Sequence, residues 1–266
     1  MSERDAAYAF GDSAPASERL TLVARIFEPS TRSLLARLPA RSGRRVLDIG
    51  CGPGHTTRLL AEVCGDAHVI GLDRSEVFLA EARRDAGPGG PSFVHADVTT
   101  PPLPHAPADV VYARYVLSHL GERAAILRGW FEALVPDGVL VMEEPEWIEA
   151  AEDVLRRYLQ ITSGLMAARG GELYVGRELG AMARALGGRV LHDDIALVSP
   201  TAGDVATMFG LNLRAYRDDP WVLAHYDAAT LDRIAAGLAA WRTLTDRGRI
   251  RWGVRQTIVE RSSGLP

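Results

Sequence analysis

A glycine-rich turn directly after a short apolar run is the feature that most constrains this chain. Residues 46–57 read VLDIGCGPGHTT, which predicts a buried strand, a tight turn and then a helix. Glycine lets the backbone turn sharply, and it lets a ligand approach where a Cβ would stand in the way. The segment therefore predicts a strand, turn and helix unit that binds a small molecule at the helix N-terminus.

The same alternation of short apolar runs and amphipathic stretches continues along the chain. Runs rich in Val, Ile and Leu predict strands, and the segments between them carry apolar residues at helical spacing. This order is typical of a parallel sheet wrapped by helices. It predicts an α/β fold with a Rossmann-like, seven-stranded, mostly parallel sheet and helices on both faces. The strands are expected at 45–49, 68–72, 92–96, 109–113, 138–143, 189–198 and 251–260, with helices at 55–63, 75–84 and 122–134.

Outside this core the chain reads mainly as helix. A helix is expected over 17–38, interrupted near Pro29, and two more over 150–186. The stretch between the last two strands is too long for a simple connection, and such excursions are more often lids or binding walls. We expect five parts: an N-terminal helical cap (1–40), the core (41–150), helices with the sixth strand (151–200), a helical insertion over the substrate (201–247), and the final strand with the tail (248–266).

Composition excludes several kinds of chemistry. The 266 residues carry a net charge of -4, so no basic field exists to hold a nucleic acid. All 30 basic residues are Arg, which excludes a P-loop lysine and a Schiff-base lysine. Cys51 and Cys64 are too few for a zinc or iron–sulfur site and are expected to be small buried apolar residues. No signal-peptide core or membrane span is found, so we expect a cytoplasmic protein without a membrane partner.

The spacing of the glycines separates two kinds of nucleotide-binding turn. A dinucleotide fingerprint would need a third glycine where this chain has His55, which disfavours a nicotinamide-dependent oxidoreductase. The pattern G-x-G-x-G after Asp48 instead resembles motif I of the class I S-adenosylmethionine-dependent methyltransferases. Later segments resemble the family's other motifs in the same order: VIGLDRS at 69–75, FVHADV at 93–98, DVVYARYVLSHL at 109–120 and ALVPDGVLVMEE at 133–144.

This resemblance implies S-adenosylmethionine as cofactor, with S-adenosylhomocysteine as its product. Asp73 would accept the ribose hydroxyl groups, and Asp97 with the following backbone N–H would read the adenine ring. Tyr8 and Arg19 resemble a leader that approaches the cofactor carboxylate. The expected cofactor-binding residues are Tyr8, Arg19, Asp48, Gly50, Cys51, Gly52, Asp73, Arg74, Asp97, Val98 and Arg114.

Two residues are candidates for acid–base catalysis, although a methyltransferase can work by positioning alone. His119 follows the fourth strand, where an imidazole could act as a general base, and the alternative is a helix histidine bonded to a loop. Glu143 and Glu144 end the fifth strand, and strand alternation allows only one of them to face the pocket. Glu144 could deprotonate a hydroxyl or pair with an amine, or it could be a solvated loop acid.

Aromatic side chains are candidates for a pocket over the sulfonium, where a cation–π contact is favourable, although aromatics at helical spacing are often simple core. The expected pocket residues are Tyr115, Trp147, Phe209, Asn212 and Tyr216, with Trp221 as a further aromatic candidate. Asn212 is the only asparagine, so an adjacent Asp-Asn metal pair and the Asn-Pro-Pro-aromatic signature of base methylation are both impossible. We expect no metal. His192, Asp193 and Asp194 suggest a metal or catalytic group, but their mid-strand position favours a structural role.

Together these features predict methyl transfer to O, N or C of a small organic molecule. Segments 27–31 and 208–213 resemble an actinobacterial group of methyltransferase-like proteins, which suggests specialised metabolism such as antibiotic biosynthesis. Two alternatives keep the fold: a cofactor-binding protein that catalyses a cyclisation or rearrangement without methylation, and a noncatalytic S-adenosylmethionine-binding module. The small-molecule substrate is the expected partner, and a homodimer is left open.

Overall fold

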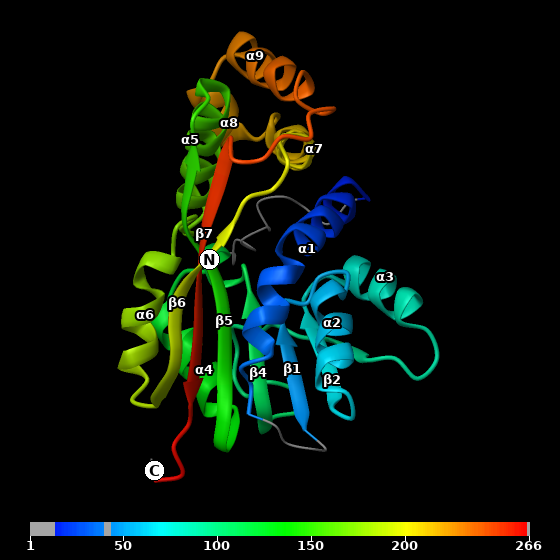
Figure 1. Ribbon diagram of the computed structural model, residues 1–266, viewed down its shortest axis with the longest axis vertical. Coiled ribbons are helices and arrows are strands. Elements are labelled where there is room, and N and C mark those ends of the chain that lie inside the picture. Colours follow the sequence, from blue (N-terminus) through cyan, green and yellow to red (C-terminus); the bar gives the residue numbers. More distant parts are fainter. Residues whose placement is uncertain (1–13, 40–43, 265–266) are drawn as a thin grey trace, which may run out of the picture.

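A seven-stranded sheet with helices on both faces forms the body of the protein (Figure 1). The structure is a computed structural model that describes residues 14–39 and 44–264. The strand order is β3-β2-β1-β4-β5-β7-β6, and β7 runs antiparallel to both of its neighbours. The predicted Rossmann-like, mostly parallel sheet is therefore confirmed. The strands are β1 (Arg45–Ile49), β2 (His68–Asp73), β3 (Ser92–His95), β4 (Ala108–Arg114), β5 (Leu134–Ala150), β6 (Arg189–Val198) and β7 (Ile250–Glu260).

Helices bury both faces of the central strands, which explains why those strands read as continuous apolar runs. Val46 and its neighbours pack with Leu60 of α2 (His55–Cys64) and Leu34 of α1 (Ala14–Leu35). On the other face, Leu47 belongs to a core with Trp130 of α4 (Arg123–Glu132), and α6 (Gly176–Ala185) packs there too. The helix α3 (Glu76–Ala86) lies against β3.

Strands β5 and β7 are longer than predicted and extend past the ends of the parallel strands. They pair from Val139 opposite Glu260 to Ala150 opposite Ile250, with a register shift between Pro145 and Trp147. The predicted end of β5 at residue 143 was wrong, because pairing with β7 continues past the proline through this bulge. We call this pair the β5–β7 ribbon.

Four helices surround the far end of the ribbon and form what we call the cap (Figure 1). Their apolar faces share one core with the start of β7, where Trp252 is 3% exposed. Helix α1 also reaches the cap, since Phe27 belongs to the same core. The cap helices are α5 (Asp153–Ala168), α7 (Ala202–Tyr216), α8 (Pro220–His225) and α9 (Ala228–Ala239).

Helix α1 runs without a break through Pro29, so the predicted interruption was wrong. A proline inside a helix removes one backbone hydrogen bond and crowds the preceding turn. Here buried side chains hold the helix on both sides of the proline: Phe27 packs into the cap core and Leu34 into the sheet core. Tertiary packing therefore outweighs the local preference.

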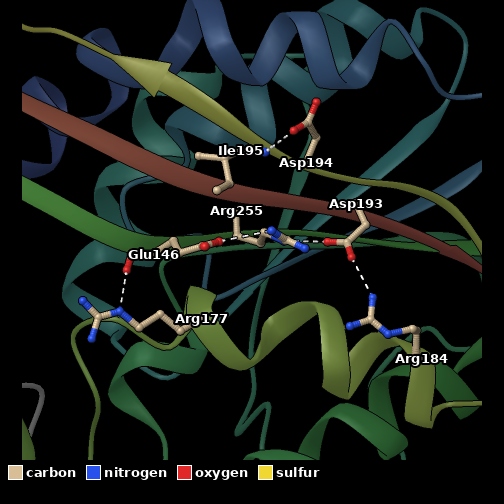
Figure 2. Close-up of polar contacts among 7 residues, drawn as sticks. All are labelled: Glu146, Arg177, Arg184, Asp193, Asp194, Ile195 and Arg255. Atoms are coloured by element: carbon tan, nitrogen blue, oxygen red, sulfur yellow. Dashed lines mark hydrogen bonds and ion pairs between the residues drawn. The ribbon is translucent and has the colours of Figure 1, made fainter.

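Four charged residues join β5, β6, β7 and α6 in what we call the ion-pair cluster: Glu146, Arg184, Asp193 and Arg255 (Figure 2). Arg255 Nε lies 2.6 Å from Asp193 Oδ1, and Arg184 Nη1 lies 2.9 Å from Asp193 Oδ2. Burial opposes ionisation of Asp193, but the hydrogen bonds and positive charges of Arg255 and Arg184 together outweigh it and lower the pKa of the carboxyl. Asp193 thus has the structural role that its mid-strand position predicted.

Candidate active site

A cavity of about 620 Å³ lies between the C-terminal ends of the parallel strands and the cap. Open α/β sheets bind their ligands at this edge. Turns after β1, β2, β3 and β4 form one side of the cavity, and residues of α1, α5, α7 and β7 form the other. Most predicted site residues line it: Arg19, Gly50, Cys51, Gly52, Asp73, Arg74, Asp97, Val98, Arg114, Tyr115, His119, Phe209 and Asn212.

The turn after β1 is shaped for a ligand that approaches the backbone. Gly50 has a φ of 64° and Gly52 a φ of 52°, both in the left-handed region that favours glycine. A Cβ on Gly50 would lie 2.7 Å from Val116 Cγ2, so the position also has no room for a side chain. The Cys51 N–H donates to Leu72 O and ties the turn to the sheet. Backbone is thus presented to the cavity just before α2, whose N-terminal N–H groups favour polar or anionic partners.

Asp48 lies beneath this turn and does not line the cavity, contrary to its predicted contact with the cofactor. Its Oδ2 accepts a hydrogen bond of 2.6 Å from Thr57 Oγ1 in the first turns of α2. Burial raises the pKa of Asp48 to about 6, although the hydrogen bonds from Thr57 and Thr56 counteract it. Asp48 therefore positions the turn by fastening β1 to α2.

Asp73 stands at the tip of β2 and lines the cavity. Its Oδ2 accepts a hydrogen bond of 2.8 Å from the N–H of Gly52, and its Oδ1 accepts one of 2.8 Å from the N–H of Ser75. Burial raises the pKa of the carboxyl, while these backbone donors counteract the rise. Each oxygen keeps a further lone pair, so the carboxylate can accept hydrogen bonds from a pair of ligand hydroxyl groups.

The segment after β3 adds a second acid at the rim of the cavity. Asp97 is exposed, and its Oδ1 accepts hydrogen bonds from Thr99 Oγ1 at 2.6 Å and Thr99 N at 2.9 Å. These bonds lower the pKa of Asp97 and keep it charged. Val98 is held from behind, since its carbonyl oxygen accepts a hydrogen bond of 2.7 Å from Trp130 Nε1. Both residues are therefore fixed where a flat heterocycle could meet them.

A buried polar network lies behind Arg114. Arg114 Nη1 donates to Thr31 Oγ1 at 3.1 Å, and this hydroxyl donates to Glu143 Oε1 at 2.8 Å. Tyr112 and Gln256 donate to the same carboxylate at 2.5 and 2.7 Å. Glu143 is therefore satisfied within the protein, on the side of the sheet that faces α1, and is kept away from the cavity.

Glu144 faces the opposite side, as strand alternation predicted, but it does not line the cavity either. Its Oε1 accepts hydrogen bonds from the N–H groups of Val116 at 2.8 Å and Leu117 at 2.7 Å. Burial raises the pKa of Glu144 to about 7 despite these donors. The structure therefore does not support the prediction that Glu144 is catalytic, because its carboxylate is used to hold the turn after β4.

His119 lies at the end of the short 3-10 helix η1 (Leu117–His119) and lines the cavity. Burial lowers its pKa to about 3, and the positive charges of Arg19 and Arg74 lower it further. The imidazole is therefore neutral at pH 7 and a weak proton acceptor. It can accept or donate a hydrogen bond in the cavity, but it is poorly suited to remove a proton from a substrate.

Five aromatic rings in mutual contact line the cavity, and we call them the aromatic wall. Phe27 meets Tyr115 edge-on with ring centroids 5.1 Å apart, and it meets Trp252 at 6.0 Å. Phe209 meets Trp252 at 5.9 Å and stacks on Tyr158 at 3.9 Å with an interplanar angle of 15°. All five rings line the same cavity, so its cap side is largely apolar.

Sequence reasoning missed much of this wall. Phe27, Tyr158 and Trp252 come from α1, α5 and β7, and they meet only in the folded chain. One signal was present: Tyr158, Thr162 and Met166 recur every four residues and all line the cavity from α5. That spacing shows a shared helix face but does not show what the face covers.

Three predicted aromatic candidates lie elsewhere. Trp147 covers Gly253 of the paired strand, where any Cβ would overlap the indole ring, and it does not line the cavity. Tyr216 is buried in the cap, where its hydroxyl lies 2.9 Å from Thr162 Oγ1. Trp221 stacks on His225 within α8. These three rings are cap or ribbon packing, and Tyr8 lies outside the described residues.

Among residues 14–39 and 44–264, no group of three or more His, Cys, Asp and Glu side chains is placed to hold a metal ion. No helix within these ranges combines the length and the apolar character needed to cross a membrane.

Known proteins resemble this chain most clearly in its core. Residues 46–138 match the family model described as methyltransferase domain. A trans-aconitate 2-methyltransferase of Methylobacterium radiotolerans is 36% identical over 172 residues, which are 65% of this chain and 62% of that protein. Another, from Methylobacterium nodulans, is 40% identical over 124 residues, 47% of each chain. The chain thus spans less than two thirds of the length of these curated relatives, which are mostly proteobacterial, and the actinobacterial grouping stays a prediction.

Solved structures share the fold at low identity. A chain from the complex of the Haloferax volcanii Trm112 methyltransferase activator has a TM-score of 0.60 and 17% identity, covering 94% of this chain and 97% of that one. The cyclase SpnF has a TM-score of 0.55 and 20% identity, covering 88% of this chain and 82% of its own. These likenesses show the fold alone, which a methyltransferase and a cyclase share.

Proposed function

We propose that this chain, whose residues 46–138 match the family model described as methyltransferase domain, transfers a methyl group from S-adenosylmethionine to a small organic molecule. The observation that carries the proposal is one cavity with two unlike sides. One side is a glycine turn with the Asp73 carboxylate beside it, and the other is the aromatic wall of the cap. A polar nucleotide-like cofactor and a less polar acceptor would thus meet in one space.

The residues present fit the cofactor. The left-handed Gly50 leaves no room for a Cβ, so the backbone of the turn stays open to a ligand. Asp73 would accept hydrogen bonds from the two ribose hydroxyl groups, and Asp97 with Val98 would bind the adenine ring. Arg19 lines the same cavity and suits the cofactor carboxylate through a bidentate pair.

Bound S-adenosylmethionine supplies a methyl group that its sulfonium already activates. The protein then has to hold the acceptor in line with that methyl and keep water away, which can supply about 7–11 kcal/mol of barrier reduction in favourable cases. The buried cap side of the cavity serves both needs. With the pKa of His119 lowered to about 3, we assign this residue to orienting the acceptor rather than to general-base catalysis.

The names of the relatives suggest trans-aconitate, a carboxylate acceptor, as one candidate substrate. The alternative function is a cyclisation on the same fold. The mass of the product distinguishes it from methyl transfer, because methylation adds the mass of one CH2 and cyclisation adds none. A role in specialised metabolism stays a prediction.

Thermal unfolding with added ligands tests the proposal first. Ligand at about 100 times its dissociation constant stabilises the native state by about 2.7 kcal/mol, and each kcal/mol raises the midpoint by roughly 2–4 °C for a chain of this size. We expect S-adenosylmethionine and S-adenosylhomocysteine to raise the midpoint by several degrees and NAD to leave it unchanged. A rise with NAD alone, or with none of the three, would contradict the proposed cofactor.

Replacing Asp73 tests the position of the cofactor. Asp73→Ala is expected to weaken S-adenosylhomocysteine binding at least about tenfold, or roughly 1.4 kcal/mol, because it removes the acceptor for the ribose hydroxyl groups. Isothermal titration calorimetry measures this directly. Asp218→Ala, which removes an exposed acid on the turn before α8, is the control and should bind normally. Equal affinities for both variants would show that Asp73 does not contact the cofactor.

A further inference from the structure

The cap side of the cavity contains little charge for an acidic acceptor. The five rings of the aromatic wall occupy it together with apolar side chains such as Leu159, Met166 and Met208. An apolar, planar ligand would bind such a surface most favourably, since aromatic pairs contribute about 0.5–1.5 kcal/mol in addition to the free energy of burying their area. The shape and chemistry of this wall therefore favour a ring system.

Four arginines of the described chain line the cavity. Arg74 and Arg114 come from the ends of β2 and β4, on the side opposite the cap, and the other two are engaged or assigned elsewhere. Arg169 lines the cavity, but its Nη2 forms an ion pair with Asp219 Oδ2. Arg19 also lines the cavity, and the proposed function uses it for the cofactor carboxylate. A molecule with three carboxylates would need several matched cations to offset its desolvation. The described part of this wall does not offer such a set.

Within the described residues, two buried polar atoms at this wall have no hydrogen-bond partner, Tyr115 Oη and Asn212 Oδ1, and only the second is an acceptor without a proton of its own. Asn212 of α7 is 7% exposed and lines the cavity. Its Nδ2 donates a hydrogen bond of 2.7 Å to Tyr158 Oη, which fixes the amide against the stacked rings. Its Oδ1 is buried without a hydrogen-bond partner in the described structure. An unsatisfied buried acceptor costs about 1–3 kcal/mol, a cost that a ligand donor would relieve.

We propose that the methyl acceptor is an uncharged, largely aromatic small molecule that lies against the stacked rings of Tyr158 and Phe209 and donates a hydrogen bond from a hydroxyl or amine to Asn212 Oδ1. This inference rests on the proposed function, because it takes the opposite side of the cavity as the cofactor side. It replaces the acidic substrate suggested by the relatives' names with a class set by this chain's own wall.

Equilibrium dialysis of three probes on the full chain, saturated with S-adenosylhomocysteine, tests the acceptor class. 2-Naphthol offers a ring and a donor, naphthalene offers the ring alone, and trans-aconitate offers carboxylates. We expect 2-naphthol to bind about five- to tenfold more tightly than naphthalene, as one neutral hydrogen bond to a buried acceptor implies. We expect trans-aconitate to bind at least about tenfold more weakly than 2-naphthol. Tighter binding of trans-aconitate than of 2-naphthol would overturn the proposal.

Two variants assign the hydrogen bond to Asn212. In Asn212→Leu the preference for 2-naphthol over naphthalene should fall to about one, because the acceptor is gone while the branching of the side chain at Cγ is kept. In Thr207→Val, a change of similar size on the same helix at a residue that does not line the cavity, the preference should persist. A preference that survives Asn212→Leu would contradict the assignment. If that variant does not fold, as judged by thermal unfolding, the three-probe series on the wild-type chain still decides the acceptor class.

Failure of the proposed function can be told apart from failure of this inference. If S-adenosylhomocysteine does not bind, the proposed function is wrong, and the same three probes are then dialysed against the chain alone. 2-Naphthol binding that depends on Asn212 would still support the aromatic site. Normal binding of S-adenosylhomocysteine with no 2-naphthol binding would leave the methyltransferase in place and remove the aromatic acceptor.

Discussion

Two polar regions of this protein treat their acids in opposite ways. In the ion-pair cluster, the guanidinium groups around Asp193 lower its pKa against the effect of burial. At three buried acids around the cavity, burial raises the pKa: that of Asp48 to about 6, that of Glu144 to about 7, and that of Asp73 as well. The cluster holds its acid as a charge with cationic partners, whereas hydroxyl and backbone N–H donors are the main support for the acids around the cavity.

The two regions also differ in what they contribute to the free energy of unfolding. The cluster ties β6 and α6 to the ribbon, and its charges are matched inside the protein. Near the cavity, Asn212 Oδ1 and Tyr115 Oη are buried without hydrogen-bond partners in the described structure. Polar groups held ready for a ligand cost stability in its absence, and this imbalance is typical of binding sites.

Breaking the cluster should give the largest change in stability. Arg255→Met leaves Asp193 and Glu146 without their shared cation, and we expect a loss of about 2 kcal/mol in the free energy of unfolding. That is below the 3–5 kcal/mol of a fully buried pair, because these side chains are 14–22% exposed. Urea unfolding measures the loss at neutral pH. Since the pKa of Asp193 is lowered by folding, the loss should shrink as the pH falls below about 4.

A neighbouring pair on the same strand is the matched control for this variant. Arg251 forms an ion pair with Glu149, and both side chains are more than half exposed. Arg251→Met should therefore change the free energy of unfolding by less than about 0.5 kcal/mol. Equal losses in the two variants would show that the cluster is no more than an ordinary surface pair.

The acid that holds the turn after β4 should give the next largest effect, with the opposite pH dependence. Folding raises the pKa of Glu144 to about 7. The stability that this group contributes is therefore fully present below the unfolded pKa of about 4.3 and is lost as the pH rises through about 7. Glu144→Gln keeps an oxygen for the backbone donors but cannot ionise. Between about pH 4.5 and pH 8 we expect the wild type to lose on the order of 1–2 kcal/mol relative to this variant.

Urea unfolding at several pH values gives this comparison, with Glu149→Gln as the exposed control. The control should follow the wild type at every pH, because its carboxylate is largely solvated. If the free energies of unfolding of the wild type and Glu144→Gln changed in parallel across this pH range, Glu144 would not be desolvated.

Removing one unpartnered hydroxyl should give the smallest change, and it should be a gain. Tyr115→Phe deletes a buried hydroxyl that has no hydrogen-bond partner in the described structure and keeps the ring against Phe27. We expect the unliganded protein to become more stable by about 0.5–1 kcal/mol. A loss of more than about 1 kcal/mol on urea unfolding would show that this hydroxyl supports the fold and is not reserved for a ligand.

The sequence predicted the parts of this protein that depend on local patterns. Strands β1 and β6 begin and end as predicted, and the glycine turn with Asp73 lies at the cavity. Motif spacing sufficed for these, because a parallel sheet brings the carboxyl ends of its strands to one edge. The same reasoning could not distinguish an acid in the cavity from one beneath it, as Asp48 and Glu144 show.

The rest depended on contacts between distant segments. The predicted β5 was too short because only its pairing with β7, about a hundred residues later, carries the backbone past Pro145. That pairing also draws Trp147 onto Gly253 and away from the cavity. The aromatic wall needs α1, α5, α7 and β7 together, and no local pattern records such a meeting.

The β5–β7 ribbon also has a consequence for how proteins of this kind diversify. The chain leaves the core for the cap along β5 and returns along β7, and the two strands are joined by backbone hydrogen bonds that depend little on side-chain identity. The helices at the far end can therefore accept substitutions, or gain and lose whole turns, without disturbing the glycine turn at the other end. If the proposed function holds, the ribbon would allow the acceptor side of the cavity to change while the cofactor side stays as it is.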